Sequence, residues 1–328
     1  MIDIDSQIKQ EIYFQKYKYI SIYEFEKVIK DLYTDIMNKI YSKSTQYNNK
    51  QLQSLLSYVK KELDIIYNDT EIEVQKDIEE LSSVFLLSEN KMLGTKFDDK
   101  LLDSIYDFEN DYVQGYTFSE LFQTHNQSTY NNIKRILSVN LLEGNNPKEF
   151  SELLYDKQVR LSRSQMLTSA RTYSKHLRDK IQNETEKNLK DLKGRMSLST
   201  LDSRTSATCV EKDKEFYDIK KYKNRKDIPN RPPRHFNCRS ILVRITENTL
   251  HFTRAANGDI KGQVDTRTTF NSFLKRNPKT AEELLGKSRY ELFKTERYNI
   301  KDFIDNGEWK TIEDLKDELL WHLVYFLL

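Results

Sequence analysis

Two short stretches, TLDSRTSATC (residues 200–209) and RPPRHFNCRS (residues 231–240), concentrate the rare residue types of this chain. They contain its only two cysteines, Cys209 and Cys238, and one of its five histidines, His235. Three of the five prolines lie at 229, 232 and 233. Because the rest of the chain is built largely from Lys, Asn, Glu, Ile, Leu and Tyr, this convergence indicates either a chemical site or an inherited motif.

Three interpretations of these residues are open. Thiolate and imidazole are ligands that zinc prefers in tetrahedral sites, and a fourth ligand to Cys209, His235 and Cys238 would be Asp202, Asp213 or water. Alternatively, Cys209 is a nucleophile and His235 its base. In the third interpretation, the cysteines are small buried side chains that hold a loop against a sheet and can form a disulfide. The third is favoured, because the zinc signature is incomplete and no catalytic context accompanies the pair.

Length and composition indicate a folded protein. A chain of 328 residues can form two domains, and 12% aromatic residues supply a core despite 32% charged residues. Two cysteines are too few for a secreted disulfide scaffold, and the N-terminus lacks the apolar segment of a signal peptide, so a cytoplasmic origin is expected. The apolar run at 319–328 is about half of the ~20 residues of a spanning helix. We therefore expect residues 317–328 to form a docking helix or tail, and no membrane span.

Charge is unevenly distributed along the chain. The net charge of +2 conceals −8 over residues 1–150 and +10 over residues 151–250. A basic middle segment suits nucleic acid or an acidic protein surface, although a charged stripe on a helix is also typical of a solvated face. The residues expected to contact such a partner lie on one helical stretch and in a Lys/Arg-rich loop: Arg171, Lys175, Arg178, Lys220, Lys221, Lys223, Arg225 and Lys226.

Apolar residues at three- and four-residue spacing predict helices through the first 143 residues. Two stripes stand out: Ile22, Phe25, Ile29, Leu32, Ile36 and Ile40, followed by Leu56, Val59, Leu63 and Ile66. Breaks are expected at residues 48–49, at 68–70, and at Gly94 and Gly115. Gly144 can supply a left-handed helix end near residue 143, and Pro147 fits the first turn of the next helix.

The second half of the chain combines helical patterns with strand patterns. A helix is expected from about 160 to 193, with Ala170, Tyr173, Leu177 and Ile181 on one face. MSLSTLDS (196–203) and CRSILVRIT (238–246) predict strands, and TAEE (280–283) and TIED (311–314) have the spacing of helix capping boxes. The expected fold is a predominantly helical α+β structure, with an N-terminal helical region, then long helices and a small antiparallel sheet.

Sequence patterns of common enzyme classes are missing. The chain has no Gly-rich phosphate loop, no G-x-S-x-G elbow and no H-E-x-x-H pair. With eight glycines it also has little material for a nucleotide cradle. No nucleotide cofactor is therefore expected.

The two opening stretches resemble the core of the Mu F-like family of tailed-phage minor head, or head morphogenesis, proteins. That family pairs T-L-D-x-R-T-C-x-x-C-x-x-x-D-G with P-P-x-H-x-N-C-R-C. The matching positions are Thr200, Leu201, Asp202, Arg204, Thr205, Cys209, Asp213, Pro232, Pro233, His235, Asn237, Cys238 and Arg239. LLEGNNPKEFSELL (141–154), TSARTYSKHL (168–177) and residues 284–306 resemble further family segments in the same order, so the similarity covers about residues 133–316.

Three departures from the family pattern concern the same motif. Ser206 and Ser240 stand where the family has cysteines, and Lys214 replaces a glycine. If the family cysteines bind a metal in some relatives, this chain has lost two of the ligands. The resemblance therefore implies a structural role for the motif, without catalysis and with zinc only as a weakened alternative.

The resemblance implies a bacteriophage minor capsid protein bound at the portal vertex inside the prohead. Its expected roles are head morphogenesis and DNA packaging or ejection, its expected partners are the portal protein, scaffolding or major capsid protein and packaged DNA, and its location is the virion after assembly in the host cytoplasm. Residues 131–316 would form the minor head domain. Residues 1–130 match no family motif, and their position and helical character alone indicate a region that docks on the portal or another partner. Two alternatives stay open: a sequence-independent DNA-binding protein, and a thiol- or metal-dependent enzyme that uses Cys209 and His235.

Overall fold

The computed structural model describes residues 4–42, 47–247, 253–259 and 261–316, which form a predominantly helical α+β fold as predicted. They divide into two compact units. The helical unit comprises Tyr17–Leu87 and Phe97–Ile181, and the mixed unit comprises the chain up to Lys16, Ser88–Lys96 and the chain from Gln182 onward. This division differs from the boundary predicted at residue 130, which lies inside a continuous helix. The predicted C-terminal tail, 317–328, lies outside the described residues.

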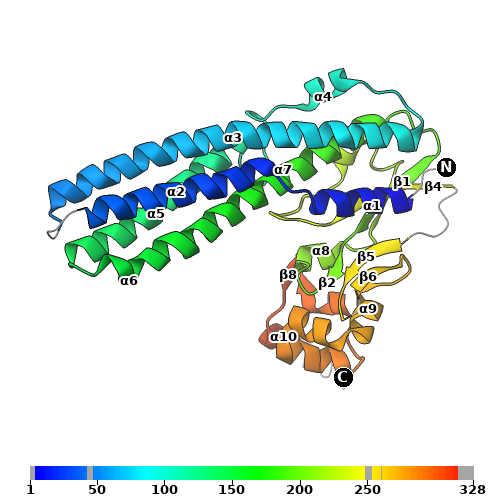
Figure 1. The fold of residues 1–328 in the computed structure, drawn as a ribbon. Helices are drawn as coiled ribbons and strands as arrows, with labels where there is room; N and C mark the ends of the chain where they lie inside the picture. The colour runs from blue at the N-terminus through cyan, green and yellow to red at the C-terminus, as the bar shows by residue number, and fades with distance from the viewer. Residues whose placement is uncertain (1–3, 43–46, 248–252, 260, 317–328) are drawn as a thin grey trace. The chain divides into compact units, whose positions relative to one another are not determined.

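The helical unit is built from long helices that run side by side (Figure 1). Its elements are α2 (Ile20–Tyr41), α3 (Asn49–Leu93), α4 (Asp99–Ile105), α5 (Phe118–Leu142), α6 (Pro147–Glu152), the π-helical turn η1 (Leu153–Gln158) and α7 (Val159–Glu186). The ends of α3 and α7 contribute residues to the mixed unit. Both predicted apolar stripes are buried, and so are Ala170, Tyr173, Leu177 and Ile181 on α7, which confirms the helical periodicity.

The helix boundaries follow local chemistry in most places. Gly144 has a φ of 74°, the Asn146 side chain accepts a hydrogen bond from the Lys148 amide at 3.1 Å, and Pro147 occupies the first turn of α6, as predicted. The predicted break at 68–70 is wrong, because α3 is continuous there. Thr70 is buried, and its hydroxyl donates to the Ile66 carbonyl at 2.6 Å, so the helix itself satisfies this polar group.

The mixed unit combines short helices with small sheets (Figure 1). Its elements are α1 (Ile4–Gln15), β1 (Leu192–Leu198), β2 (Leu201–Asp202), α8 (Ala207–Glu211), β3 (Phe216–Asp218), the 3-10 turn η2 (Arg225–Asp227), β4 (Ile241–Thr246), β5 (Thr253–Asn257), β6 (Lys261–Asp265), α9 (Phe270–Arg276), α10 (Pro278–Lys294), the 3-10 turn η3 (Ile300–Phe303), β7 (Ile304–Asp305) and β8 (Glu308–Trp309). The sheet orders are β3-β1-β4, β2-β5-β6 and β7-β8. Each pair is antiparallel except β2 with β5.

The strands and helices of the mixed unit match the sequence patterns with two corrections. MSLSTLDS contains the end of β1 and all of β2, and CRSILVRIT contains β4, which confirms both strand predictions. The helix expected to extend to residue 193 is shorter than predicted. It ends at Glu186, and residues from Leu192 onward form β1 instead. TIED forms a capping box, in which the Asp314 amide donates to the Thr311 hydroxyl at 3.1 Å. TAEE does not, because α10 begins earlier, at Pro278.

Candidate functional site

Folding brings Cys209, His235 and Cys238 together, although the two cysteines lie 29 positions apart in the sequence. The short helix α8 begins after Ser206, whose hydroxyl accepts a hydrogen bond from the Cys209 amide at 3.4 Å. In the second stretch, the Cys238 amide donates to the His235 carbonyl at 3.1 Å, which closes a tight turn. Asn237 adopts a φ of 58° in this turn, a left-handed conformation that asparagine tolerates. The two cysteine side chains are buried and free of a disulfide.

The three side chains meet at contact distance. Cys209 Sγ lies 3.3 Å from His235 Nε2 and 3.8 Å from Cys238 Sγ, and the three candidate ligand atoms all lie within 4.8 Å of one another. Hydrogen bonding from the Cys238 thiol lowers the pKa of Cys209 to about 5, against the opposing effect of burial and with help from the two serine hydroxyls at positions 206 and 240. The cluster therefore holds a sulfur that is readily deprotonated next to an imidazole.

The tautomer of His235 follows from its neighbours. Its Nδ1 lies 2.8 Å from the Phe236 carbonyl oxygen, which can only accept a hydrogen bond. Nδ1 therefore carries the proton, and the lone pair of Nε2 faces Cys209 and the hydroxyl of Ser206, which lies 2.8 Å away. This is the tautomer that either a base or a metal ligand would require.

Asp202 and Asp213, two of the three candidates for a fourth ligand, are engaged by arginines, so water is the candidate that stays open. Asp202 binds the guanidinium of Arg239 with both oxygens, and it also accepts a hydrogen bond from the Thr205 hydroxyl at 2.9 Å. Asp213 binds the guanidinium of Arg254, with Asp213 Oδ1 2.5 Å from Nη2 and Oδ2 3.0 Å from Nη1. Among the described residues, the cluster has two sulfur ligands and one nitrogen ligand.

These two carboxylates hold the surroundings of the cluster in place. Asp213 also accepts a hydrogen bond from the Ser199 amide at 2.9 Å, and the Ser199 hydroxyl donates to the Cys209 carbonyl at 2.7 Å. The Ser240 hydroxyl lies 2.9 Å from that of Ser199. Arg204 remains 75% exposed, with its guanidinium 3.9 Å from Asp202. Of the matched motif, the two aspartates therefore act as structural anchors, whereas Arg204 contributes little.

A buried cluster of charges in the mixed unit was not predicted from the sequence. Glu186, at the end of α7, accepts hydrogen bonds from the Nε atoms of Arg195 at 2.6 Å, Arg225 at 2.8 Å and Arg244 at 2.9 Å. Arg244 also binds Glu89. All five side chains are at most 3% exposed. The only sequence signal was an arginine in each of two apolar strands, at positions that pair directly in the sheet.

The electrostatics of this cluster favour an ionised Glu186. Burial raises its pKa, but the opposing effects of Arg225, Arg244 and Arg195 are together larger and lower the pKa to about 2. The carboxylate is therefore charged in the folded protein at neutral pH. It supplies a negative charge to three buried guanidinium groups.

The basic residues proposed to contact an acidic partner separate into two groups. Arg225 is 1% exposed and its guanidinium binds Glu186, so its predicted phosphate contact is wrong. Lys175 and Arg178 are also buried, and the Arg178 guanidinium lies over the Phe85 ring at 4.8 Å, so the predicted contact of these two residues with an acidic partner is wrong. Arg171 is half-buried, and its contact stays a prediction. The exposed members are the loop lysines Lys220, Lys221, Lys223 and Lys226.

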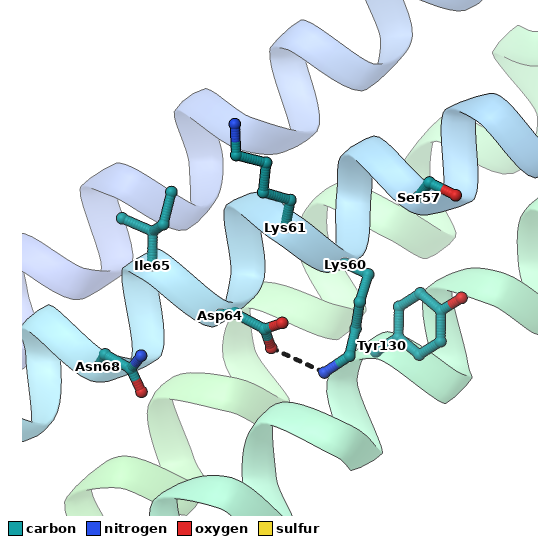
Figure 2. Close-up of a pocket in the computed structure, with 7 residues that line it drawn as sticks. All are labelled: Ser57, Lys60, Lys61, Asp64, Ile65, Asn68 and Tyr130. Atoms are coloured by element: carbon teal, nitrogen blue, oxygen red, sulfur yellow. Dashed lines mark hydrogen bonds and ion pairs between the residues drawn. The ribbon is translucent and has the colours of Figure 1, made fainter.

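A groove of about 470 Å³ lies in the helical unit, away from the motif residues in sequence. Figure 2 shows its lining by Ser57, Lys60, Lys61, Asp64, Ile65, Asn68 and Tyr130 from α3 and α5. Asp64 Oδ1 already accepts hydrogen bonds from Lys60 at 2.7 Å and from Asn126 at 2.7 Å. The carboxylate is thus engaged in holding two helices together, and the groove offers no pair of groups arranged for acid and base catalysis.

Neither the search for membrane-spanning helices nor the comparison with known proteins identifies a functional class. Within the described ranges, no helix is both long and apolar enough to cross a bilayer. Comparisons with family models, with curated proteins and with solved structures found no match. A function for this chain is therefore inferred from its own residues and their geometry.

Proposed function

We propose that this chain is a minor capsid protein of a tailed phage that binds the portal vertex inside the prohead and acts in head morphogenesis and DNA packaging or ejection. The observation that carries the proposal is the convergence of the motif residues. Asp202 from the first stretch pairs with Arg239 from the second, and Cys209 meets His235 and Cys238. The two halves of the motif that resembles the Mu F-like family therefore bind each other. Such an arrangement is suited to maintaining a fold that the members of a family share.

A structural role for the motif agrees with its burial. A thiol enzyme that used Cys209 as its nucleophile and His235 as its base would have the required contact at 3.3 Å. Its substrate would also have to reach the sulfur, but Cys209 is only 2% exposed. The geometry therefore favours a packed cluster over a nucleophilic site.

The helical unit carries the surface expected for docking on another protein. Four large apolar side chains on α3 are between 42% and 68% exposed: Ile65, Ile72, Val84 and Leu87. Exposed apolar groups on one long helix are typical of surfaces that bind a partner helix. We propose that this face contributes to binding of the portal protein.

Co-expression with the portal protein of the same phage tests the assignment. We expect the two proteins to purify together, and we expect the double variant Ile65→Ser, Ile72→Ser to lose at least about tenfold in affinity, because a few buried apolar side chains carry most of the binding energy of an interface. The matched control is Lys61→Ser, Asp69→Ser, which changes two exposed polar residues of the same helix segment at unchanged net charge. Failure of the unmodified chain to purify with the portal protein would contradict the proposal.

The exposed lysines of the 220–226 loop favour contact with packaged DNA. Phosphate neutralisation by lysine makes affinity fall with salt, with a slope of about −0.9 per phosphate contact on duplex DNA. Changing Lys220, Lys221, Lys223 and Lys226 to Gln should therefore make the salt dependence of DNA binding shallower. The control changes four exposed lysines of α9 and α10 to Gln: Lys275, Lys279, Lys287 and Lys294. Equal slopes for both variants, or no binding of the unmodified chain at ~50 mM salt, would remove the loop as a DNA contact.

A further inference from the structure

We infer that Cys209, His235 and Cys238 form a binding site for a thiophilic divalent cation, Zn²⁺, whose fourth ligand is a water molecule held beside Ser206. The inference is independent of the capsid role, since it rests on the geometry of the side chains. It differs from a closed four-ligand zinc site, because the chain places a serine hydroxyl where a fourth thiolate would complete the coordination.

The distances between the ligand atoms agree with a tetrahedral ion. With zinc about 2.3 Å from sulfur and about 2.0 Å from nitrogen, tetrahedral angles separate two sulfurs by about 3.8 Å and a sulfur from a nitrogen by about 3.5 Å. The two sulfurs lie 3.8 Å apart, and Cys209 Sγ lies 3.3 Å from His235 Nε2. The third pair, Cys238 Sγ and the imidazole nitrogen, lies within 4.8 Å, so an ion would enter with an adjustment in the position of the imidazole.

The imidazole is already oriented as a metal ligand. Its Nδ1–H donates to the Phe236 carbonyl at 2.8 Å, which is the outer hydrogen bond that metal-binding histidines commonly make. Nε2 consequently presents its lone pair to Cys209 Sγ, which lies 3.3 Å away. The ligand set carries two negative charges when both thiols are ionised, so a divalent cation would make the buried cluster neutral.

The fourth position is defined by Ser206. Its hydroxyl lies 2.8 Å from His235 Nε2, and the residue is fixed as the cap of α8. A neutral hydroxyl is a weak zinc ligand, but it can hold a bound water by a hydrogen bond. Asp202 and Asp213 are engaged by Arg239 and Arg254, so neither carboxylate competes for this position.

Metal analysis of the full chain tests this site. We expect protein purified with a reductant to contain one zinc ion per chain, and the metal-free protein to bind Co²⁺ with the absorption bands of tetrahedral thiolate coordination. Cys209→Ser, Cys238→Ser and His235→Gln should each weaken Zn²⁺ binding by more than the 10- to 100-fold that loss of an outer hydrogen bond costs. The control Glu211→Gln removes a carboxylate from the same short helix and should bind as the unmodified chain does.

A gain of function separates metal binding from a purely structural role. Ser206→Cys replaces the water by a thiolate and should tighten Zn²⁺ binding by at least about tenfold. Circular dichroism identifies any ligand variant that fails to fold. If one does, the test rests on the Zn²⁺ affinity of Ser206→Cys compared with that of the unmodified chain. The inference is overturned if reduced, folded protein takes up neither Zn²⁺ nor Co²⁺, if the cysteine variants bind as tightly as the control, or if the thiols are recovered only as a Cys209–Cys238 disulfide.

Discussion

Replacing Glu186 with Gln should destabilise the mixed unit by about 3–5 kcal/mol, the cost of removing one partner from a buried ion pair. The carboxylate lies between Arg195, Arg225 and Arg244, and each of the four side chains is at most 2% exposed. A neutral amide would accept fewer hydrogen bonds and leave buried guanidinium charge uncompensated. Denaturant unfolding of the full chain, followed by circular dichroism, measures the loss as a lower midpoint.

The matched control is Glu184→Gln, two residues earlier on the same helix. Glu184 is partly exposed and pairs with Lys187 at 2.5 Å across one helical turn, so its loss should leave the unfolding midpoint unchanged. A fall in midpoint that is equal for the two variants would mean that the helix end is sensitive to any substitution. It would contradict a specific role for the buried cluster.

The pH dependence of unfolding provides a second check on Glu186. Because its pKa is lowered from 4.5 to about 2 on folding, the carboxylate stabilises the fold fully above pH 4.5 and loses this effect as pH falls towards 2. The lowered pKa corresponds to about 3 kcal/mol. Glu186→Gln should lack this part of the acid sensitivity, whereas Glu184→Gln should retain it.

Asp213→Asn is the second substitution with a large expected effect, about 3 kcal/mol of lost stability. Asp213 and Arg254 are both buried, and their two-point ion pair joins the segment after α8 to β5. The same carboxylate accepts a hydrogen bond from the Ser199 amide. Asparagine would leave the Arg254 charge buried without a counter-ion, and thermal unfolding would show a lower midpoint.

The control for Asp213 is an exposed aspartate–arginine pair. Asp265 and Arg267 also form a two-point contact, at 3.0 Å and 3.1 Å, but both side chains are solvated. Asp265→Asn should therefore leave the midpoint unchanged, since water screens the pair and can replace it. If Asp213→Asn were equally silent, the matched aspartate of the motif would have no anchoring role.

Sequence patterns predicted the elements better than the pairings between them. The stripe from Ile22 to Ile40 identified a buried helix face, because helical periodicity is a local property of the chain. The break predicted at residues 68–70 is wrong, because a polar cluster is compatible with a helix when its hydroxyl donates a hydrogen bond to the preceding turn. The Thr70 hydroxyl does so to the Ile66 carbonyl. Likewise, the charge of Arg225 indicated a surface residue, and only the position of Glu186 explains its burial.

By itself, the sequence determined the helical periodicity, the strand segments and the three residue types that could meet as a cluster. The tertiary structure decided which of them meet: it joined Cys209 to His235 and Cys238, assigned Asp202 and Asp213 to arginines, and buried Arg225. The physical reason is that periodicity and capping depend on neighbours along the chain, whereas ion pairing and ligand geometry depend on groups brought together over long sequence separations by folding.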